Sequence, residues 1–324
     1  MSDKLKVAMY WAAGCGGCDI ALLELHEQLI NFIEHVDIVF WPCVIDIKYK
    51  DVEAMHDGSI DACFINGAMR NEENIQVAQM LRRKSKVLIA YGACSCFGGI
   101  VGLANFSNCE SLLTRVYDTT ESTINPEKIR PQLRTKLADG TIELPQLTDY
   151  VGALGDFASV DYYMPGCPPV TEQTSYVCNL LAQNQLPPPP AIIGAGDKAV
   201  CFECPLEKHD TKVEKFYRII DKIPDGKTCL LEQGIICMGP ATRSGCGAQC
   251  LQVNMPCRGC YGAAGNTTDQ GAKMVSLLGS ILKSEDPETI KNCIQDITDA
   301  AGTFYRFSLP ASWLRHANEK MTKE

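Results

Sequence analysis

The sequence predicts an α/β fold with a flavodoxin-like, doubly wound parallel sheet, followed by a cysteine-rich, mostly irregular and helical part. Short apolar runs typical of buried strands alternate with helix-like segments in the first half. Four consecutive prolines, Pro187–Pro190, then interrupt the chain, and residues 201–260 hold eight cysteines among Gly, Pro and polar residues. Since 324 residues are enough for two domains, we predict one over 1–186 and one over 187–324.

Strands in the first half are predicted from runs of β-branched, aromatic and other apolar residues. They are apolar almost throughout, which is typical of parallel strands covered by helices on both faces. A further short strand precedes Cys167. Helix-like apolar spacing covers Ile20–Glu34 and Glu72–Lys84. The four clearest strand candidates are Lys6–Trp11, Val36–Trp41, Asp61–Asn66 and Lys86–Tyr91.

The second half has less regular structure. A run of four prolines cannot continue a helix or a central strand, so it marks a boundary and a stiff spacer. Within the cysteine-rich block, only Thr211–Lys222 has the pattern of a helix. Beyond it, Gln270–Lys283 and Pro287–Ala300 are predicted helices, with Asp286 as N-cap and Pro287 at the first helical position.

Charge and hydropathy exclude several function classes. The chain has 30 Lys+Arg against 39 Asp+Glu and no basic block, which argues against nucleic acid or an anionic membrane as main partner. No stretch approaches 18 apolar residues, and the N-terminal sequence resembles neither a secretory nor a twin-arginine signal. We therefore expect a cytoplasmic chain, where 18 cysteines indicate metal ligation or redox chemistry; disulfides are the competing interpretation.

Four cysteines follow predicted strands: Cys15 and Cys18 in a C-G-G-C turn, Cys94, and Cys167. Turns at the carboxyl ends of parallel strands converge at one edge, where ligands bind. A Cys₄ set there suits a [4Fe–4S] cluster, and the adjacent glycines allow backbone N–H groups to approach sulfur. Buried structural thiols are the alternative, which suits the remaining first-half cysteines and one near the C-terminus: Cys43, Cys63, Cys96, Cys109, Cys178 and Cys293.

The cysteine-rich block supplies enough thiols for two more Cys₄ sites. Pairing by sequence order is natural, although spacing alone leaves interleaving open. Structural zinc is a second interpretation, since C-x₂-C pairs also occur in zinc ribbons, and it would make the chain a zinc-stabilised flavin-binding or scaffold protein. The eight residues are Cys201, Cys204, Cys229, Cys237, Cys246, Cys250, Cys257 and Cys260.

Other motifs do not predict catalysis by this chain. Ala191–Ala199 resembles a dinucleotide-binding G-x-G-x-x-A turn, but no helix is predicted after it. No nucleophile and acid–base pair stands out, so the residues themselves predict no catalytic residue in this chain.

Together these motifs resemble the small, electron-transfer subunit of [NiFe] hydrogenases over nearly the whole chain. The likeness is strongest in C-G-G-C-D at Cys15–Asp19, G-A-C-x-x-F-G-G at Gly92–Gly99, P-G-C-P-P at Pro165–Pro169 and the cysteine-rich block. The resemblance implies three [4Fe–4S] clusters here and a partner large subunit that carries the Ni–Fe centre. The implied ligands are Cys15, Cys18, Cys94 and Cys167 (proximal), Cys246, Cys250, Cys257 and Cys260 (medial), and Cys201, Cys204, Cys229 and Cys237 (distal).

In two features this chain differs from many periplasmic members of the family and resembles the cytosolic members. Many periplasmic members have His where this chain has Cys201, and the additional thiol of Cys250 implies a four-iron rather than a three-iron medial cluster. The nearest likeness is to the F420-non-reducing (methyl-viologen-reducing) hydrogenases of methanogens. That group implies heterodisulfide reductase as electron acceptor, reached through a further iron–sulfur subunit. A deazaflavin-reducing hydrogenase or a complex-I-like enzyme is the alternative.

Asp19 stands where many family members have Glu, and the resemblance implies a proton-path role for it. The alternative is stabilisation of a helix N-terminus, where Asp is favoured.

Overall fold

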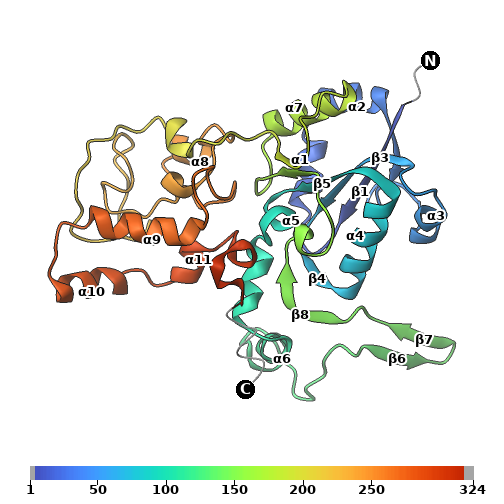
Figure 1. The fold of residues 1–324 in the computed structure, drawn as a ribbon. Helices are drawn as coiled ribbons and strands as arrows, with labels where there is room; N and C mark the ends of the chain where they lie inside the picture. The colour runs from blue at the N-terminus through green and yellow to red at the C-terminus, as the bar shows by residue number, and fades with distance from the viewer. Residues whose placement is uncertain (1–3, 317–324) are drawn as a thin grey trace.

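The computed structural model describes residues 4–316, and their N-terminal part forms the predicted parallel α/β sheet (Figure 1). Every neighbouring pair of the six strands is parallel, in the order β10-β9-β5-β3-β1-β2. Apart from the added strand β10, this is the flavodoxin-like order of doubly wound sheets. The strands are β1 (Leu5–Trp11), β2 (Val36–Phe40), β3 (Ile60–Asn66), β5 (Ser85–Tyr91), β9 (Tyr162–Met164) and β10 (Ala191–Ile192).

Successive strand residues point to opposite faces, and each face has its own apolar core. Val7 and Met9 of β1 belong to one core, and Ala8 and Tyr10 belong to the other. The first core is covered by α1 (Gly17–Leu23), α2 (Glu27–His35) and α7 (Thr171–Ala182), and the second by α3 (Tyr49–Glu53), α4 (Glu72–Lys84) and α5 (Ala93–Phe97). Both faces are buried, which explains why the strands are apolar almost throughout.

The helix boundaries agree with the sequence patterns except where tertiary structure intervenes. Helix α4 spans the predicted residues, and the Asn71 side chain caps it by accepting from Asn74 N at 2.8 Å. The helix predicted over Ile20–Glu34 is instead divided into α1 and α2. His26 has a φ of 51°, a conformation that cannot continue a right-handed helix.

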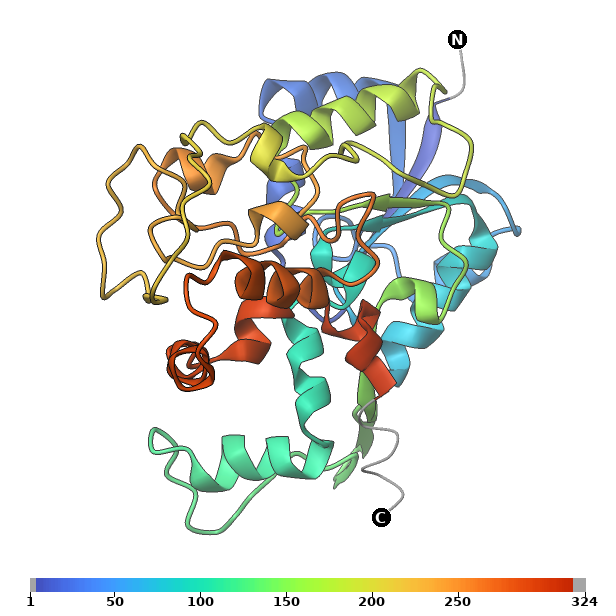
Figure 2. The same ribbon diagram turned by 60° about the vertical axis from the view of Figure 1, so that its left-hand side comes forward.

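An arm projects from the carboxyl end of the sheet (Figures 1 and 2). It begins with a 3₁₀ helix, η1 (Ile100–Phe106), and returns to the body in β8, which pairs antiparallel with β4. Its hairpin was not among the predicted strands, although Asp139-Gly140 between alternating apolar residues is a hairpin signal. After η1, its elements are α6 (Cys109–Leu113), a π-helical turn (Thr114–Thr119), the hairpin β6 (Arg134–Leu137) and β7 (Gly140–Glu143), and β8 (Leu147–Gly152), whereas β4 (Met69–Asn71) belongs to the body.

The C-terminal part is largely irregular, as predicted, and packs around a third apolar core that includes Phe216, Met274 and Phe304. Asp286 caps α10 by accepting from Thr289 N at 2.9 Å, although this helix ends at Gln295. The helices are α8 (Gln249–Gln252), α9 (Gln270–Ile281), α10 (Pro287–Gln295) and α11 (Ala300–Phe304), with 3₁₀ turns at Leu154–Asp156, Val200–Phe202, Gly239–Ala241, Leu309–Ala311 and Trp313–His316.

The helix predicted over Thr211–Lys222 is wrong. Val213 N donates to Ile281 O at 2.9 Å, and Tyr217 N donates to Gly234 O at 2.8 Å. Because these amides pair with two distant segments, they cannot form a helical ladder.

The division of the chain at residue 186 stays a prediction. Within residues 4–316, no helix is long and apolar enough to cross a membrane.

The C-terminal segment also packs against η1. Gly99 N donates to Phe307 O at 3.2 Å, and a Cβ atom at Gly102 would lie 2.4 Å from the Pro310 ring. Gly102→Ala should therefore lower the free energy of unfolding by about 1–3 kcal/mol through overpacking. Denaturant unfolding of the purified protein measures this change.

Gly279→Ala in α9 is the matched control, because no atom lies within 4 Å of the added Cβ. Alanine is the better helix former, so this variant should gain about 0.5–1 kcal/mol. Equal effects of the two substitutions would show that the contact between Gly102 and Pro310 does not matter.

Candidate metal centres

The first candidate set of thiols lies at the carboxyl edge of the sheet, as predicted. Cys15 and Cys18 follow β1, Cys94 lies in α5 directly after β5, and Cys167 follows β9. The turns after β5 and β9 are joined, because Ala93 N donates to Gly166 O at 2.6 Å. Three strands that are far apart in sequence thus bring their cysteines to one place.

Glycine allows these turns to approach the sulfur atoms. Gly92 has a φ of 87°, and a Cβ there would lie 2.3 Å from Cys18 Sγ. A Cβ at Gly99 would also lie 2.3 Å from Cys94 Sγ. Any larger residue would collide with a candidate ligand, which accounts for the glycines beside the cysteines.

Electrostatic interactions connect every pair within this set. Cys18 interacts with the other three, Cys94 with Cys15, and Cys167 with both Cys94 and Cys15. Burial raises the pKa of Cys18, and charges at Cys94 and Cys167 raise it further. Burial also raises the pKa of Cys94, whereas N–H groups of Ile100 and Val101 act in the opposite direction by stabilising its thiolate.

A second set surrounds a cavity of about 380 Å³ between the two parts of the chain. Cys257 interacts electrostatically with Cys246 and Cys250, and Cys260 interacts with Cys257 and Cys246. All four side chains line the cavity, together with Cys167 of the first set. Thiolates are the ligands that iron–sulfur clusters use, so this donor set around a cavity fits a cluster.

The third set lies farther along the C-terminal part. Cys201 interacts with Cys204 and Cys229, and Cys229 also interacts with Cys204. Cys237 interacts with Cys201 of this group, and more strongly with Cys257 of the second set. Burial raises the pKa of Cys201 to about 11, although the ammonium group of Lys208, whose Nζ donates to Cys201 O at 2.6 Å, opposes the rise.

Cysteines of neighbouring sets interact with one another. Cys260 of the second set interacts electrostatically with Cys167 of the first, and both line the same cavity. At the other side, Cys257 N donates to Cys237 Sγ of the third set at 3.3 Å. The three sets therefore form a contiguous series.

Tyr261 fixes the junction between the first two sets. Its hydroxyl accepts from Val170 N at 3.2 Å and donates to Gln173 Oε1 at 2.6 Å. Since Val170 and Gln173 follow Cys167 while Tyr261 follows Cys260, this buried side chain ties the two ligand loops together.

Most of the remaining cysteines have structural surroundings. Cys63, Cys96, Cys178 and Cys293 are buried, as predicted, and Cys96 Sγ contacts Ala90 O at 3.3 Å. Cys43 is exposed, so the prediction of a buried thiol is wrong there, and Cys109 is only partly buried. Among the residues described, no three His, Cys, Asp or Glu lie close enough to hold one metal ion.

Asp19 is buried behind the first set. Its carboxylate accepts from Trp41 Nε1 at 2.8 Å and from Asn66 Nδ2 at 2.9 Å. It lies in the first turn of α1 but caps no backbone N–H of that helix. Trp41 and Asn66 were not predicted as site residues, although Trp41 directly follows β2 and Asn66 ends β3, at the same edge as the cysteines.

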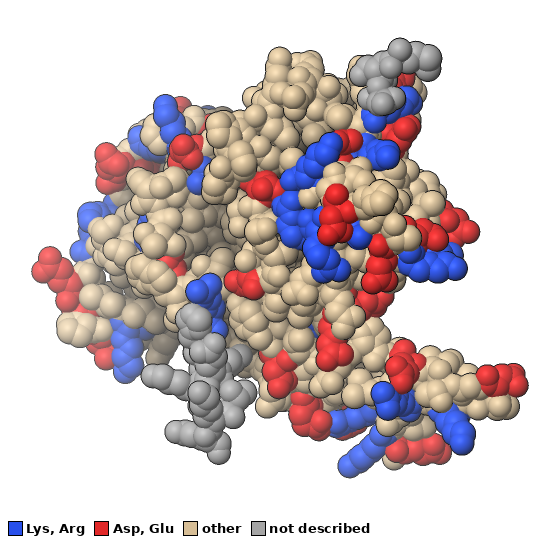
Figure 3. Space-filling view, turned by 45° about the vertical axis from the view of Figure 1, so that its right-hand side comes forward, with Lys and Arg blue, Asp and Glu red and all other residues tan. Residues whose placement is uncertain are grey.

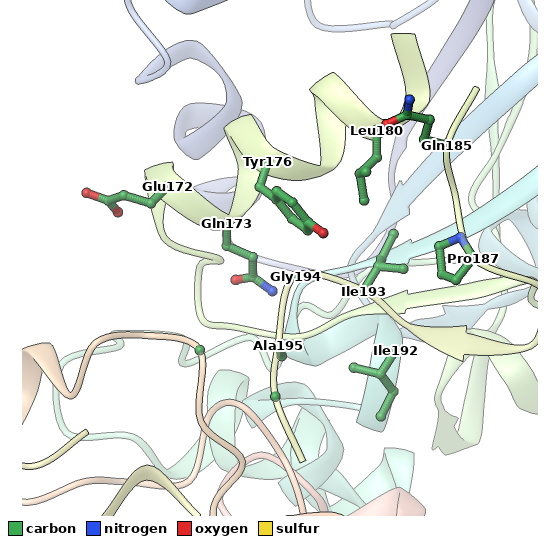
Figure 4. Close-up of a pocket in the computed structure, with 12 residues that line it drawn as sticks. Glu172, Gln173, Tyr176, Leu180, Gln185, Pro187, Ile192, Ile193, Gly194 and Ala195 are labelled. Carbon is green, nitrogen blue, oxygen red and sulfur yellow. The ribbon is translucent and has the colours of Figure 1, made fainter. Parts of the chain in front are cut away.

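A separate hollow of about 590 Å³ lies between α7 and residues 192–196 (Figure 4). The glycine-rich segment that resembles a dinucleotide-binding turn forms one wall of it. Only a 3₁₀ turn at Val200–Phe202 follows, so the segment does not lead into the α-helix on which such a site depends. None of the candidate ligands lines this hollow.

Comparison with known proteins identifies relatives over almost the whole chain. Residues 15–181 match the family of the NADH ubiquinone oxidoreductase 20 Kd subunit. The chain is 40% identical to the iron-sulfur subunit of the F420-non-reducing hydrogenase of Archaeoglobus profundus, over 98% of this chain and 99% of that protein. It is 35% identical to a subunit of the F420-non-reducing hydrogenase of Methanothermobacter marburgensis, over 96% of each.

Solved structures share the fold. A [NiFeSe]-hydrogenase chain from Dm. baculatum aligns with a TM-score of 0.50 and 17% identity, over 80% of this chain and 95% of that one. At this identity the likeness concerns the fold alone.

Asp19 offers a test of the network behind the first set. Asp19→Ala would leave two buried N–H donors, of Trp41 and Asn66, without partners. It should lower the free energy of unfolding by about 1–3 kcal/mol for each unpaired donor, whereas Asp19→Asn, which keeps one acceptor, should cost less. Chemical unfolding followed by tryptophan fluorescence measures both variants; equal stability of Asp19→Ala and the unsubstituted protein would contradict the network.

Proposed function

Since this chain belongs to the small-subunit family of [NiFe] hydrogenases, which includes its relatives from the F420-non-reducing hydrogenases, we propose that it is an electron relay with three [4Fe–4S] clusters. It is the non-catalytic subunit of a hydrogenase. In this proposal it carries electrons from H₂ oxidation at the Ni–Fe centre of the large subunit to a partner such as heterodisulfide reductase.

The single observation that carries the proposal is the contiguity of twelve thiols. They form three sets of four, and neighbouring sets meet at Cys167–Cys260 and at Cys237–Cys257. Electron transfer needs carriers at short separations, and structural sites have no such need. When bound, each cluster supplies a reversible one-electron carrier.

In this proposal, the residues of this chain ligate the clusters, limit their contact with water and set their reduction potentials. Backbone N–H groups directed at sulfur, such as those of Ile100 and Val101 at Cys94, favour the thiolate form that ligates iron. Apolar and aromatic side chains, including Tyr261 and Phe307, wall the cavity around the middle set and limit access of water. Hydrogen bonding to sulfur and solvent exposure are what set the reduction potential of such sites.

Two groups of three thiols interact among themselves, which supports ligand sets in sequence order, whereas Cys237 lies between the groups and interacts with both Cys257 and Cys201. Cys201, Cys204 and Cys229 interact with one another, as do Cys246, Cys250 and Cys257. We assign the first group, with Cys237, to the distal cluster and the second, with Cys260, to the medial cluster. Cys15, Cys18, Cys94 and Cys167 hold the proximal cluster.

Electrons would enter where the first set reaches the surface. Cys15 and Cys167 are exposed, and we place the large subunit over this edge of the sheet. At the opposite end of the series, Phe202 beside Cys201 is 74% exposed. We propose this end for the further iron–sulfur subunit that connects to heterodisulfide reductase. A cytoplasmic location is part of the proposal, because ligand thiols must remain reduced.

Two roles for Asp19 follow from its position. It pairs the buried N–H donors of Trp41 and Asn66, and it lies beside Cys18 close to where the large subunit would dock. If Asp19 also carries protons, Asp19→Asn should slow H₂/D₂ exchange in the intact complex. Normal exchange and turnover with reduced stability would leave only the structural role.

Cys250→Ser tests the ligand assignment, because serine is a poor ligand for iron in such clusters. The variant should alter the medial cluster and leave the other two, lowering bound iron by up to about four atoms in about twelve. Iron and acid-labile sulfide analysis, with EPR of the anaerobically purified complex, measures this loss. Full occupancy and unchanged spectra of all three clusters would reject the assignment.

Cys43→Ser is the matched control, since Cys43 is also an exposed thiol and belongs to none of the three sets. It should retain all iron.

The same analysis of the unsubstituted protein separates the relay from the zinc interpretation. Matching iron and sulfide support the relay, whereas zinc accompanied by flavin would contradict it.

A further inference from the structure

The outer part of the arm, residues 121–147, which we call the hairpin arm, is almost entirely exposed within the part of the chain that the structure describes. From Glu121 to Leu147, every residue is exposed except Asn125 and Arg130, which are partly buried. Both views of the fold show this segment projecting from the body (Figures 1 and 2). An isolated two-stranded hairpin is at best marginally stable in water, which favours a partner that covers it.

The register of the hairpin gives it one apolar face. Thr135 lies opposite Ile142, and Leu137 lies opposite Gly140. One step beyond, Leu144 N donates to Leu133 O at 2.9 Å, which extends the pairing to two more leucines. Because strand residues alternate between faces, one face carries four large apolar side chains. These are Leu133 (52% exposed), Leu137 (49%), Ile142 (52%) and Leu144 (49%).

The opposite face is polar. Arg134 lies opposite Glu143 with an ion pair of 2.9 Å, and Lys136 lies opposite Thr141. Figure 3 shows acidic and basic side chains along the arm on the side in view. A hairpin exposed to water on both faces would not need this division, whereas one that packs on a partner through a single face would.

Polar contacts at its base hold the arm in place. Arg130 pairs with Glu110 at 2.7 Å and with Asp118, and it donates to Thr114 Oγ1 at 2.9 Å. Asn125 bridges Tyr117 O and Ile129 O at 3.0 and 2.9 Å. The arm is therefore presented in a defined orientation, which reduces the entropy lost on binding.

Exposed apolar residues connect the arm with the proximal thiols. The 3₁₀ helix η1 begins beside Cys94 and leads into α6 and the arm (Figure 2). Along this path Ile100 is 49%, Phe106 51% and Val116 53% exposed. A partner that covers the proximal edge can thus continue over apolar surface to the hairpin.

We propose that the hairpin arm, residues 121–147, is a docking arm for the subunit that carries the Ni–Fe centre, and that its leucine face packs on an apolar surface of that subunit. This inference rests on the proposed function, which places that subunit over the proximal edge. The expected interface is therefore one continuous apolar surface running from the proximal thiols along η1 to the hairpin.

Ile142→Glu tests the apolar face, and Thr141→Glu is its matched control. The two residues are neighbours in β7 that point to opposite faces, and each change adds one carboxylate. In the complex purified with its large subunit, Ile142→Glu should raise at least tenfold the protein concentration at which half of the complex dissociates. Thr141→Glu should change this concentration less than twofold. Equal effects of the two variants would overturn the proposal.

A second measurement does not depend on the stability of the substituted hairpin. A photo-crosslinking amino acid incorporated in place of Leu137 in the intact complex should label the large subunit, whereas one in place of Thr141 should label it weakly. Labelling of a second copy of this chain, or of another subunit, would overturn the assignment. Iron content distinguishes failure of this inference from failure of the proposed function. A complex with normal iron content but no crosslinks from the hairpin arm would refute only the docking arm, whereas a complex without clusters would refute the electron relay itself.

Discussion

The candidate centres depend on one topological constraint, the parallel direction of β1, β5 and β9. Because these strands run the same way, the turns that carry Cys15, Cys18, Cys94 and Cys167 leave the sheet at one edge. If β5 ran antiparallel, Cys94 would lie a strand length away, on the order of 20 Å. The strand between them, β3, contributes Asn66 to Asp19 behind the same turns, so even the central strand supports the site.

The C-terminal part positions its candidate ligands without a sheet. Its ligand loops are held by an apolar core and by individual backbone hydrogen bonds, such as Met238 N to Cys257 O at 2.9 Å. One contact with the N-terminal part lies at Cys167, Cys260 and Tyr261, where the first two thiol sets meet, and another lies where the C-terminal segment packs on η1. The proposed path for electrons crosses the first of these contacts, which ties the relative position of the parts to the separation of their clusters.

Much of the N-terminal fold could be predicted because its strands are apolar on both faces and α4 has a clear cap. The convergence of the first four cysteines followed from the rule that turns meet at the carboxyl edge of a parallel sheet. Other features were set by distant contacts that periodicity does not reveal. Val213 and Tyr217 pair with different segments, which prevented a helix, and a positive φ at His26 divided another. The partners of Asp19 lie at the ends of β2 and β3, and only the three-dimensional arrangement identifies them.

The central claim is that the thiol sets hold three clusters in a contiguous series with the medial cluster in the middle. Low-temperature EPR of the anaerobically purified complex, poised where all clusters are reduced, tests this claim most directly. Magnetic interaction with both neighbouring clusters should split the EPR signal of the medial cluster. Cys250→Ser should remove or alter the corresponding splitting in the signals of the proximal and distal clusters. Three signals without mutual interaction, or direct coupling between the proximal and distal clusters that survives loss of the medial one, would contradict the series.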